Sequence, residues 1–224
     1  MNKNTRLSLI LLFFIALIVA GTFFYKIQHP ATGASKDFAL HQSVKIDGTV
    51  LNKPRDISAF ILTTGNNQPF TNQNLKQHWT LMFFGFTNCP YACPVTLAAL
   101  NKTVIALRAQ LPSHLVPQVV MVSVDPERDT AAKMKQYTSV FNKNFIGARA
   151  NPIMTKQLAD QLDVVYSKQV EPNGSYTVNH SAEVMLIDPN GKLRAFFAYP
   201  HTATVMAHDY EMIISSVYNK KLSG

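Results

Sequence analysis

The chain has two cysteines, and both stand in the stretch FFGFTNCPYACP, residues 83–94. Three residues separate Cys89 from Cys93. A free cysteine is often only a small buried hydrophobic residue. Two cysteines this close together can also form a disulfide, serve as a redox dithiol or hold a soft metal ion. The pair by itself leaves these alternatives open.

The surroundings of the two cysteines predict the start of a helix. Pro94 is accommodated in a first helical turn, where its missing N–H costs nothing. The free N–H groups and the dipole of a helix start favour the thiolate, which is both the nucleophile and the metal ligand. Residues i and i+4 of one turn have Cβ atoms about 5–6 Å apart, whereas a relaxed disulfide prefers about 3.8 Å. The spacing moderately favours metal, although a small backbone shift would allow the disulfide.

A third ligand would have to come from a histidine, of which the chain has seven. His180 stands in YTVNHSAEVMLID, immediately before a predicted buried strand, and no proline lies between Gly174 and Asp188. Two thiolates and an imidazole suit copper, because soft sulfur selects Cu(I) and imidazole also accepts Cu(II). A structural zinc site would usually need a fourth protein ligand. The residues alone leave open whether His180 is a ligand or an ordinary histidine.

Periodicity predicts the elements that would position these residues. Residues 79–86 and 118–125 are apolar runs of the length expected for strands buried on both faces. Leucine and valine at steps of three and four predict a helix after Pro94. Further helices are predicted within 125–141, 153–167 and 204–221, and a hairpin is predicted over 182–199 with its turn at Pro189–Gly191.

This order of elements predicts an α/β thioredoxin-like fold, with an N-terminal β-hairpin added over residues 44–52 and turning at Asp47–Gly48. In such a fold the first core strand leads into the first core helix at Cys89 and Cys93. The loop containing His180 faces that helix start, at the place where thioredoxin-type reductases have a proline.

The N-terminal residues predict a membrane anchor. Residues 7–25 contain no charge and follow Lys3 and Arg6. As a helix they would span about 28 Å, close to the ~30 Å hydrocarbon core of a bilayer. We predict a cytoplasmic tip and single transmembrane helix over 1–25, a tether over 26–37 and one domain over 38–224. The basic residues before the span favour a bacterial inner-membrane protein whose soluble domain faces the periplasm, an oxidising compartment. Cleavage near residues 31–35 is the alternative.

Charge excludes one class of partner. The net charge is +8, but no run of Lys or Arg is longer than Lys220–Lys221. Nucleic-acid binding requires basic residues that cluster on one face. We therefore expect no nucleic-acid partner.

Three stretches, FFGFTNCPYACP, VSVDPERDT and VNHSAEVMLIDPNGK, resemble the signature motifs of the Sco (SenC) family of copper-binding assembly factors. The resemblance implies Cys89, Cys93 and His180 as ligands of Cu(I) and Cu(II), and a redox disulfide between Cys89 and Cys93. It also places Asp125 near the site, as a residue that would support a ligand without binding the metal itself. The alternative role for Asp125 is a helix cap with Pro126 in the first turn.

The resemblance implies one of two functions in the assembly of cytochrome c oxidase. In the first, a membrane-anchored copper chaperone, not an enzyme, delivers copper to the Cu-A site of a cytochrome c oxidase subunit. In the second, a thiol–disulfide reductase keeps the cysteines of that subunit reduced for metallation. Other periplasmic copper carriers or thiol reductases are further expected partners. A peroxidase is disfavoured, because no lone cysteine stands in a Thr/Arg pocket.

Overall fold

The structure is a computed structural model that describes Leu17 and residues 46–222, with the backbone alone for 219–222. The chain divides into two units, Met1–Lys45 and Ile46–Gly224. The second unit contains every element described below.

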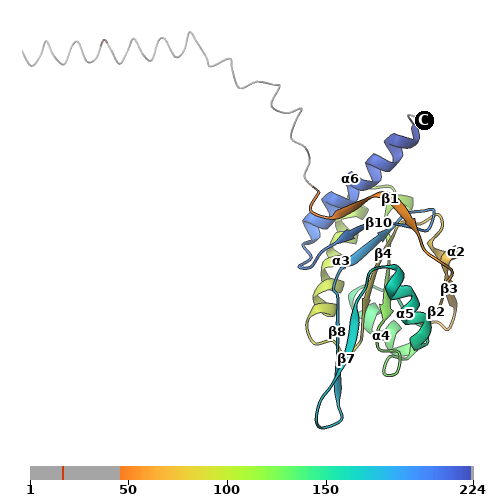
Figure 1. The fold of residues 1–224 in the computed structure, drawn as a ribbon. Helices are drawn as coiled ribbons and strands as arrows, with labels where there is room; N and C mark the ends of the chain where they lie inside the picture. Colours follow the sequence, from red (N-terminus) through yellow and green to blue (C-terminus); the bar gives the residue numbers. More distant parts are fainter. Residues whose placement is uncertain (1–16, 18–45, 223–224) are drawn as a thin grey trace, which may run out of the picture. The chain divides into compact units, whose positions relative to one another are not determined.

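The second unit is built around an eight-stranded mixed sheet with the order β1-β10-β9-β4-β5-β6-β2-β3 (Figure 1). A separate two-stranded sheet pairs β7 with β8. The strands are β1 (Thr49–Asp56), β2 (Ile61–Thr64), β3 (Pro69–Thr71), β4 (Thr80–Gly85), β5 (Gln118–Ser123), β6 (Ile146–Arg149), β7 (Tyr166–Val170), β8 (Tyr176–His180), β9 (Val184–Ile187) and β10 (Lys192–Phe197). The α-helices are α2 (Asn72–Leu75), α3 (Ala92–Gln110), α4 (Ala131–Phe141), α5 (Pro152–Gln161) and α6 (Ala203–Leu222), and a short 3-10 helix spans Ser113–Leu115.

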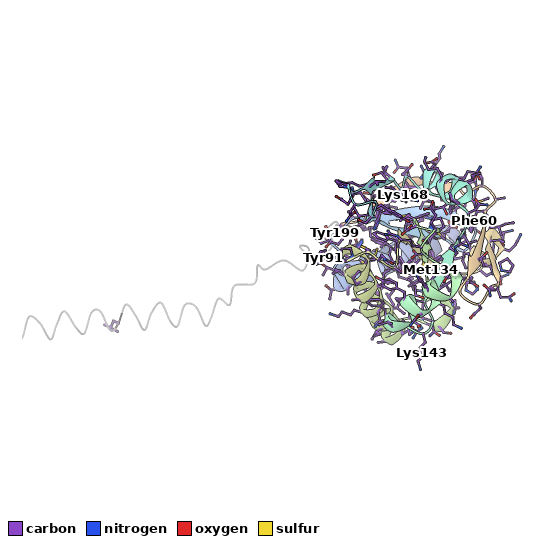
Figure 2. All side chains as sticks on the ribbon, turned by 90° about the horizontal axis from the view of Figure 1, so that it is seen from below. Phe60, Tyr91, Met134, Lys143, Lys168 and Tyr199 are labelled. Carbon is purple, nitrogen blue, oxygen red and sulfur yellow. The ribbon has the colours of Figure 1, made fainter. Side chains whose placement is uncertain are left out.

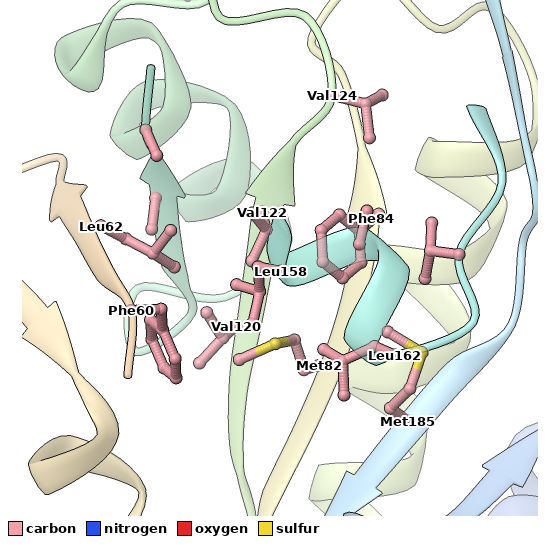
Figure 3. Packing of buried hydrophobic residues seen from close by; sticks show 14 of the residues in the cluster. Phe60, Leu62, Met82, Phe84, Val120, Val122, Val124, Leu158, Leu162 and Met185 are labelled. Carbon is pink, nitrogen blue, oxygen red and sulfur yellow. The ribbon is translucent and has the colours of Figure 1, made fainter. Parts of the chain in front are cut away.

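The central strand β4 is buried on both faces, as its apolar sequence predicts. Successive side chains of a strand point to opposite faces, so Leu81 and Phe83 join one hydrophobic cluster, and Met82 and Phe84 join another. The first cluster includes residues of α3, α4 and α6, and the second includes residues of α5. Figure 3 shows the second cluster, with α5 over β4, β5 and β9. Each fully buried apolar side chain contributes about 1.5–3 kcal/mol to this packing.

Strand β4 pairs parallel with β5, and β5 pairs parallel with β6, so the C-terminal ends of all three strands lie on the same side of the domain. The segments that follow β4 and β5 therefore lie next to each other. The first contains both cysteines, and the second contains Asp125 and Asp129. The thioredoxin-like arrangement thus brings together two of the three motifs that the sequence singles out.

Several predicted elements are confirmed. The helix after Pro94 is α3, which buries Leu97, Leu100, Val104 and Leu107. The hairpin predicted over 182–199 is β9–β10. Its turn contains Gly191 at φ +76, a conformation that glycine adopts without steric cost.

Other elements differ from the prediction. Strand β1 pairs antiparallel with β10. The first strand of the hairpin predicted over 44–52 lies mostly on residues 44 and 45, outside the described residues, so that hairpin stays a prediction. The pairing with β10 is a long-range contact that a local turn signal at Asp47–Gly48 does not reveal. The short strand predicted at the end of 153–167 overlaps the first residues of β7. Strand β6 was not predicted, because it has only four residues, and strand β8 was not predicted, because it is short and largely polar.

The predicted transmembrane segment and tether lie outside the described residues, apart from Leu17. Among the residues that the structure does describe, none of the helices combines the length and the apolar character that a bilayer crossing requires.

Candidate metal centre

The cysteine segment joins β4 to α3, and only one of its sulfurs lies within the helix. Cys93 is the second residue of α3, whereas Cys89 lies in the turn before it. Tyr91, the N-cap residue, makes no capping hydrogen bond with its side chain. The backbone N–H of Cys93 instead donates to the Cys89 sulfur at 3.4 Å. Cys89 Sγ thus accepts from one of the free N–H groups at the helix start, which favours its thiolate form.

Gly85, the last residue of β4, makes room for the second sulfur. A Cβ atom at position 85 would lie 2.7 Å from Cys93 Sγ and 3.1 Å from Met121 Cε. Both distances are shorter than ordinary van der Waals contact. Glycine at this position therefore lets the Cys93 side chain pack against the end of the strand, with 1% of its surface exposed.

The two thiols have unequal acidities. A hydrogen bond from the Cys93 thiol lowers the pKa of Cys89 to about 4, against the opposing effect of burial. The same hydrogen bond, together with burial, raises the pKa of Cys93 well above its usual range. The pair therefore shares one proton, which a bound cation would displace.

His180 approaches the sulfurs from the β7–β8 hairpin. It is the last residue of β8, not part of a loop as predicted, and pairs with Tyr166 of β7. Its Nδ1 lies 2.8 Å from the carbonyl oxygen of Ser181, and because a carbonyl only accepts, Nδ1 carries the proton. In the neutral ring Nε2 then has a free lone pair, and this nitrogen lies 3.6 Å from Cys93 Sγ. The Phe86 ring packs edge-on against the imidazole, with centroids 5.8 Å apart.

The structure thus brings together the three side chains that the sequence nominates. The ligand atoms of Cys89, Cys93 and His180 all lie within 4.8 Å of one another. Two sulfurs and one imidazole nitrogen form a soft donor set, of the kind that selects copper. The arrangement is able to hold a metal ion or to pass electrons as a dithiol.

Asp125 contacts the hairpin that contains His180. It is fully buried and accepts hydrogen bonds from the Arg128 side chain and from the Tyr176 hydroxyl, the latter at 2.8 Å. Helix α4 begins at Ala131 and is capped by Thr130, so the alternative role of Asp125 as the cap of this helix is wrong. Asp125 is instead tied to β8 through Tyr176.

Asp129 contacts the cysteine segment, and sequence reasoning did not single it out. Its buried carboxylate accepts from the Thr87 hydroxyl at 2.5 Å, from the Thr87 backbone N–H at 3.2 Å and from the Ser123 hydroxyl at 2.6 Å. Thr87 precedes Cys89 by two residues, so Asp129 holds the cysteine segment to the end of β5. The stretch DPERDT contains both carboxylates, and nothing in it distinguishes their targets.

His201 is a second residue that sequence reasoning missed. Its Nε2 lies 2.8 Å from the carbonyl oxygen of Ala182, two residues after His180. Burial lowers the pKa of His201, so the neutral ring donates from Nε2 to this carbonyl. The contact fixes the segment that leads from His180 into β9.

With this geometry in place, comparison with known proteins decides the family. The SCO1/SenC family model matches residues 50–215, well over half of the chain. The chain belongs to the SCO1/SenC family. A protein of Stutzerimonas stutzeri is 35% identical over 151 residues, which cover 67% of this chain and 73% of the relative. The mitochondrial protein SCO2 of Saccharomyces cerevisiae is 36% identical over 135 residues, which cover 59% of this chain and 44% of the relative.

Solved structures of the family have the same fold. Arabidopsis thaliana ScoI with copper bound has a TM-score of 0.67 and 30% identity, and the match covers 71% of this chain and 98% of that chain. Bradyrhizobium japonicum ScoI with copper bound has a TM-score of 0.63 and 31% identity, with 70% and 99% covered. The match spans less than half of the yeast SCO2 and of an Arabidopsis SCO1 homologue.

Proposed function

We propose that this SCO1/SenC protein is a membrane-anchored copper chaperone, which binds copper through Cys89, Cys93 and His180. It delivers the metal to the Cu-A site of a cytochrome c oxidase subunit. The observation that carries the proposal is the convergence of two sulfurs and one imidazole nitrogen within 4.8 Å. The copper-bound structures of two relatives support the choice of metal.

The site suits a metal carrier because one of its two sulfurs is buried and the other can be reached by a partner. Cys93 is buried, whereas Cys89 is half-buried, next to Tyr91 with 80% of its surface exposed. An incoming ligand from an acceptor protein would reach the metal from the Cys89 side. Asp125 contributes indirectly, since it positions β8 and hence His180. Outer contacts of this kind typically alter metal affinity by about 10–100-fold.

The second candidate function is thiol–disulfide reduction of the oxidase subunit. It is favoured by the low pKa of Cys89 beside a buried free thiol. The Cys89 thiolate would attack a partner disulfide and form a mixed disulfide, releasing one partner thiolate. Cys93, after losing its proton, would then displace the second. Two electrons pass to the partner, which becomes a dithiol, and Cys89 and Cys93 end as a disulfide that no longer binds copper.

Copper binding by variants of the reduced protein tests the site. Wild type should bind one copper per chain, and Cys89→Ala or Cys93→Ala should abolish tight binding, because one sulfur and one imidazole hold Cu(I) poorly. His180→Ala should weaken Cu(II) more than Cu(I), by more than the roughly 100-fold upper limit of an outer contact. His114→Ala, in the short 3-10 helix, is the matched control. Wild-type affinity in either cysteine variant would exclude the site.

Oxidase activity in cells separates the two functions. The Cys89–Cys93 disulfide should still form and exchange in His180→Ala, because the imidazole is not part of that bond. If copper delivery is the function, His180→Ala cells should lose oxidase activity and partly regain it with added copper. Full activity of His180→Ala cells at low copper, combined with loss in Cys89→Ala cells, would favour the reductase instead.

A further inference from the structure

Acidic residues are absent from two long stretches of the sequence. No Asp or Glu occurs between Asp56 and Asp125, or between Asp129 and Asp160. The first stretch contains β2, β3, α2, β4, α3 and β5, and the second contains α4 and β6. The carboxylates that balance surface lysines elsewhere in the described domain are therefore missing from these elements.

The two stretches meet around a cavity of about 720 Å³. One wall is the β2–β3 turn with α2 and the segment leading into β4. The other wall is the C-terminal part of α4 with the segment leading into β6. The volume lies within the roughly 300–1,000 Å³ range of small-molecule sites. A second hollow of about 520 Å³ continues from it, since His78, Gln118 and Asn144 line both.

Every charged side chain that lines the larger cavity is a lysine. These are Lys76, Lys135 and Lys143, accompanied by His78, and no described Asp or Glu is among the lining residues. Within the described part of the chain, none of the three lysines forms an ion pair. Lys135 Nζ donates to Asn66 Oδ1 at 2.6 Å, so its ammonium is held at the wall by a neutral group. The remaining polar lining is rich in amides, including Gln68, Gln73 and Gln118.

This cavity is separate from the metal centre. It lies where β4, β5 and β6 begin, whereas the cysteine segment follows the end of β4. Five residue steps along β4 correspond to about 17 Å at ~3.3 Å per residue. Figure 2 shows Lys143 on the opposite side of the domain from Lys168 of β7, the strand paired with the one containing His180. A ligand here would leave the cysteines accessible.

We propose that this cavity binds a phosphate-bearing ligand through Lys76, Lys135 and Lys143. Three uncompensated cations in a concave site concentrate anions. Lysine binds phosphate as a point charge, and the charged side chains that line the larger cavity are all lysines. The amides supply neutral donors and acceptors for the ester and hydroxyl oxygens of an organophosphate. The ligand is either a soluble organophosphate or the headgroup of an anionic phospholipid.

Lysine footprinting of the full-length protein in phosphatidylcholine vesicles tests the proposal. The acetylation rate of each lysine is measured by mass spectrometry with glycerol 1-phosphate added, and separately with phosphatidylglycerol included in the vesicles. Acetylation of Lys76, Lys135 and Lys143 should slow at least threefold in one or both conditions. Lys53 and Lys102, which are exposed and outside the cavity, are internal controls and should stay unchanged.

Slower acetylation of the three lysines with glycerol 1-phosphate would identify a soluble ligand. Slower acetylation only with phosphatidylglycerol would identify a lipid headgroup. Protection in neither condition, or equal protection of the control lysines, would overturn the proposal. Lys135→Gln/Lys143→Gln should abolish protection of Lys76, whereas Lys53→Gln/Lys102→Gln, with the same loss of charge, should retain it. Persistent protection of Lys76 in the first variant would also overturn the proposal. Both variants should bind copper as wild type does, which verifies their folding independently of the ligand.

Discussion

At the scale of single residues, Cys89 and Cys93 have the same side chain in different surroundings. Cys89 accepts hydrogen bonds before the start of α3, whereas Cys93 packs in the core against Gly85. A buried sulfur is shielded from solvent reagents, and a thiolate reacts where a thiol does not. The two sulfurs therefore differ in both accessibility and reactivity, with Cys89 half-buried and Cys93 buried.

The pKa of Cys89, at about 4, predicts the pH dependence of its alkylation. A lowered pKa means that the thiolate persists to lower pH, so the rate with iodoacetamide should already be on its plateau at about pH 6. An unperturbed thiol with a pKa of about 8.5 would still gain more than tenfold between pH 6 and 8. Cys93→Ala removes the hydrogen bond that lowers the pKa, so its rate should rise with pH over that interval. A rising rate in wild type would contradict the shared-proton pair.

Asp129→Asn should weaken copper binding without touching a ligand. The amide keeps the shape of the carboxylate, but its NH₂ group cannot accept from the Thr87 N–H or the Ser123 hydroxyl. Hydrogen bonds to a charged group contribute about 1.5–3 kcal/mol each, so we expect lower stability in urea unfolding and about tenfold weaker copper binding. Asp160→Asn, which removes only an exposed pair with Lys156, is the control. Unchanged copper affinity in Asp129→Asn would show that the hydrogen bonds to Asp129 are not needed to position the cysteine segment.

At the scale of elements, the β7–β8 hairpin brings His180 to the two cysteines. It is fastened to the segment after β5 by Tyr176, whose hydroxyl donates to Asp125 and whose ring lies 3.8 Å from the Arg128 guanidinium. Lys168 adds an ion pair with Glu127 at 2.6 Å. The hairpin belongs to its own small sheet, so these contacts set the position of His180.

Tyr176→Leu should loosen the hairpin and leave the main sheet intact. The substitution removes the hydrogen bond to a buried carboxylate and a cation–π contact of about 0.5–2 kcal/mol. Amide hydrogen exchange should accelerate in β7 and β8 but not in β4, and Cu(II) affinity should fall about tenfold because His180 is less well positioned. Tyr218→Leu, on α6, is the control. Unchanged exchange in β8 would show that Tyr176 does not anchor the hairpin.

At the scale of the whole molecule, the two ends of the strands have different chemistry. The metal centre lies where β4 and β5 end, and the lysine-lined cavity lies where they begin. Three lysines that are far apart in the sequence line one cavity, although the sequence contains no run of basic residues there. The local excess of positive charge therefore depends on the fold.

Membrane attachment is also a whole-molecule prediction, and it rests on residues outside the described part of the chain. The uncharged segment 7–25 after Lys3 and Arg6 predicts that full-length protein sediments with membranes after a high-salt wash. Alkaline phosphatase fused after Gly224 should be active, because the enzyme needs the oxidising side of the membrane for its disulfides. A soluble mature protein that begins near Ser35 would contradict the anchor.

The sequence by itself determined the type of fold and nominated the residues of the site. Buried strands and amphipathic helices have strong periodic signals, and the spacing of the chain's two cysteines, with His180 before a predicted strand, already points to soft-metal or dithiol chemistry. Only the tertiary structure decided that β1 pairs with β10, that Asp129 holds the cysteine segment while Asp125 holds the hairpin, and that Lys76, Lys135 and Lys143 share a cavity. The physical reason is the separation of the interacting residues along the chain. Periodicity and helix capping involve near neighbours, which the sequence shows directly. Strand pairing, side-chain hydrogen bonds and local charge involve distant segments that meet only in the folded domain.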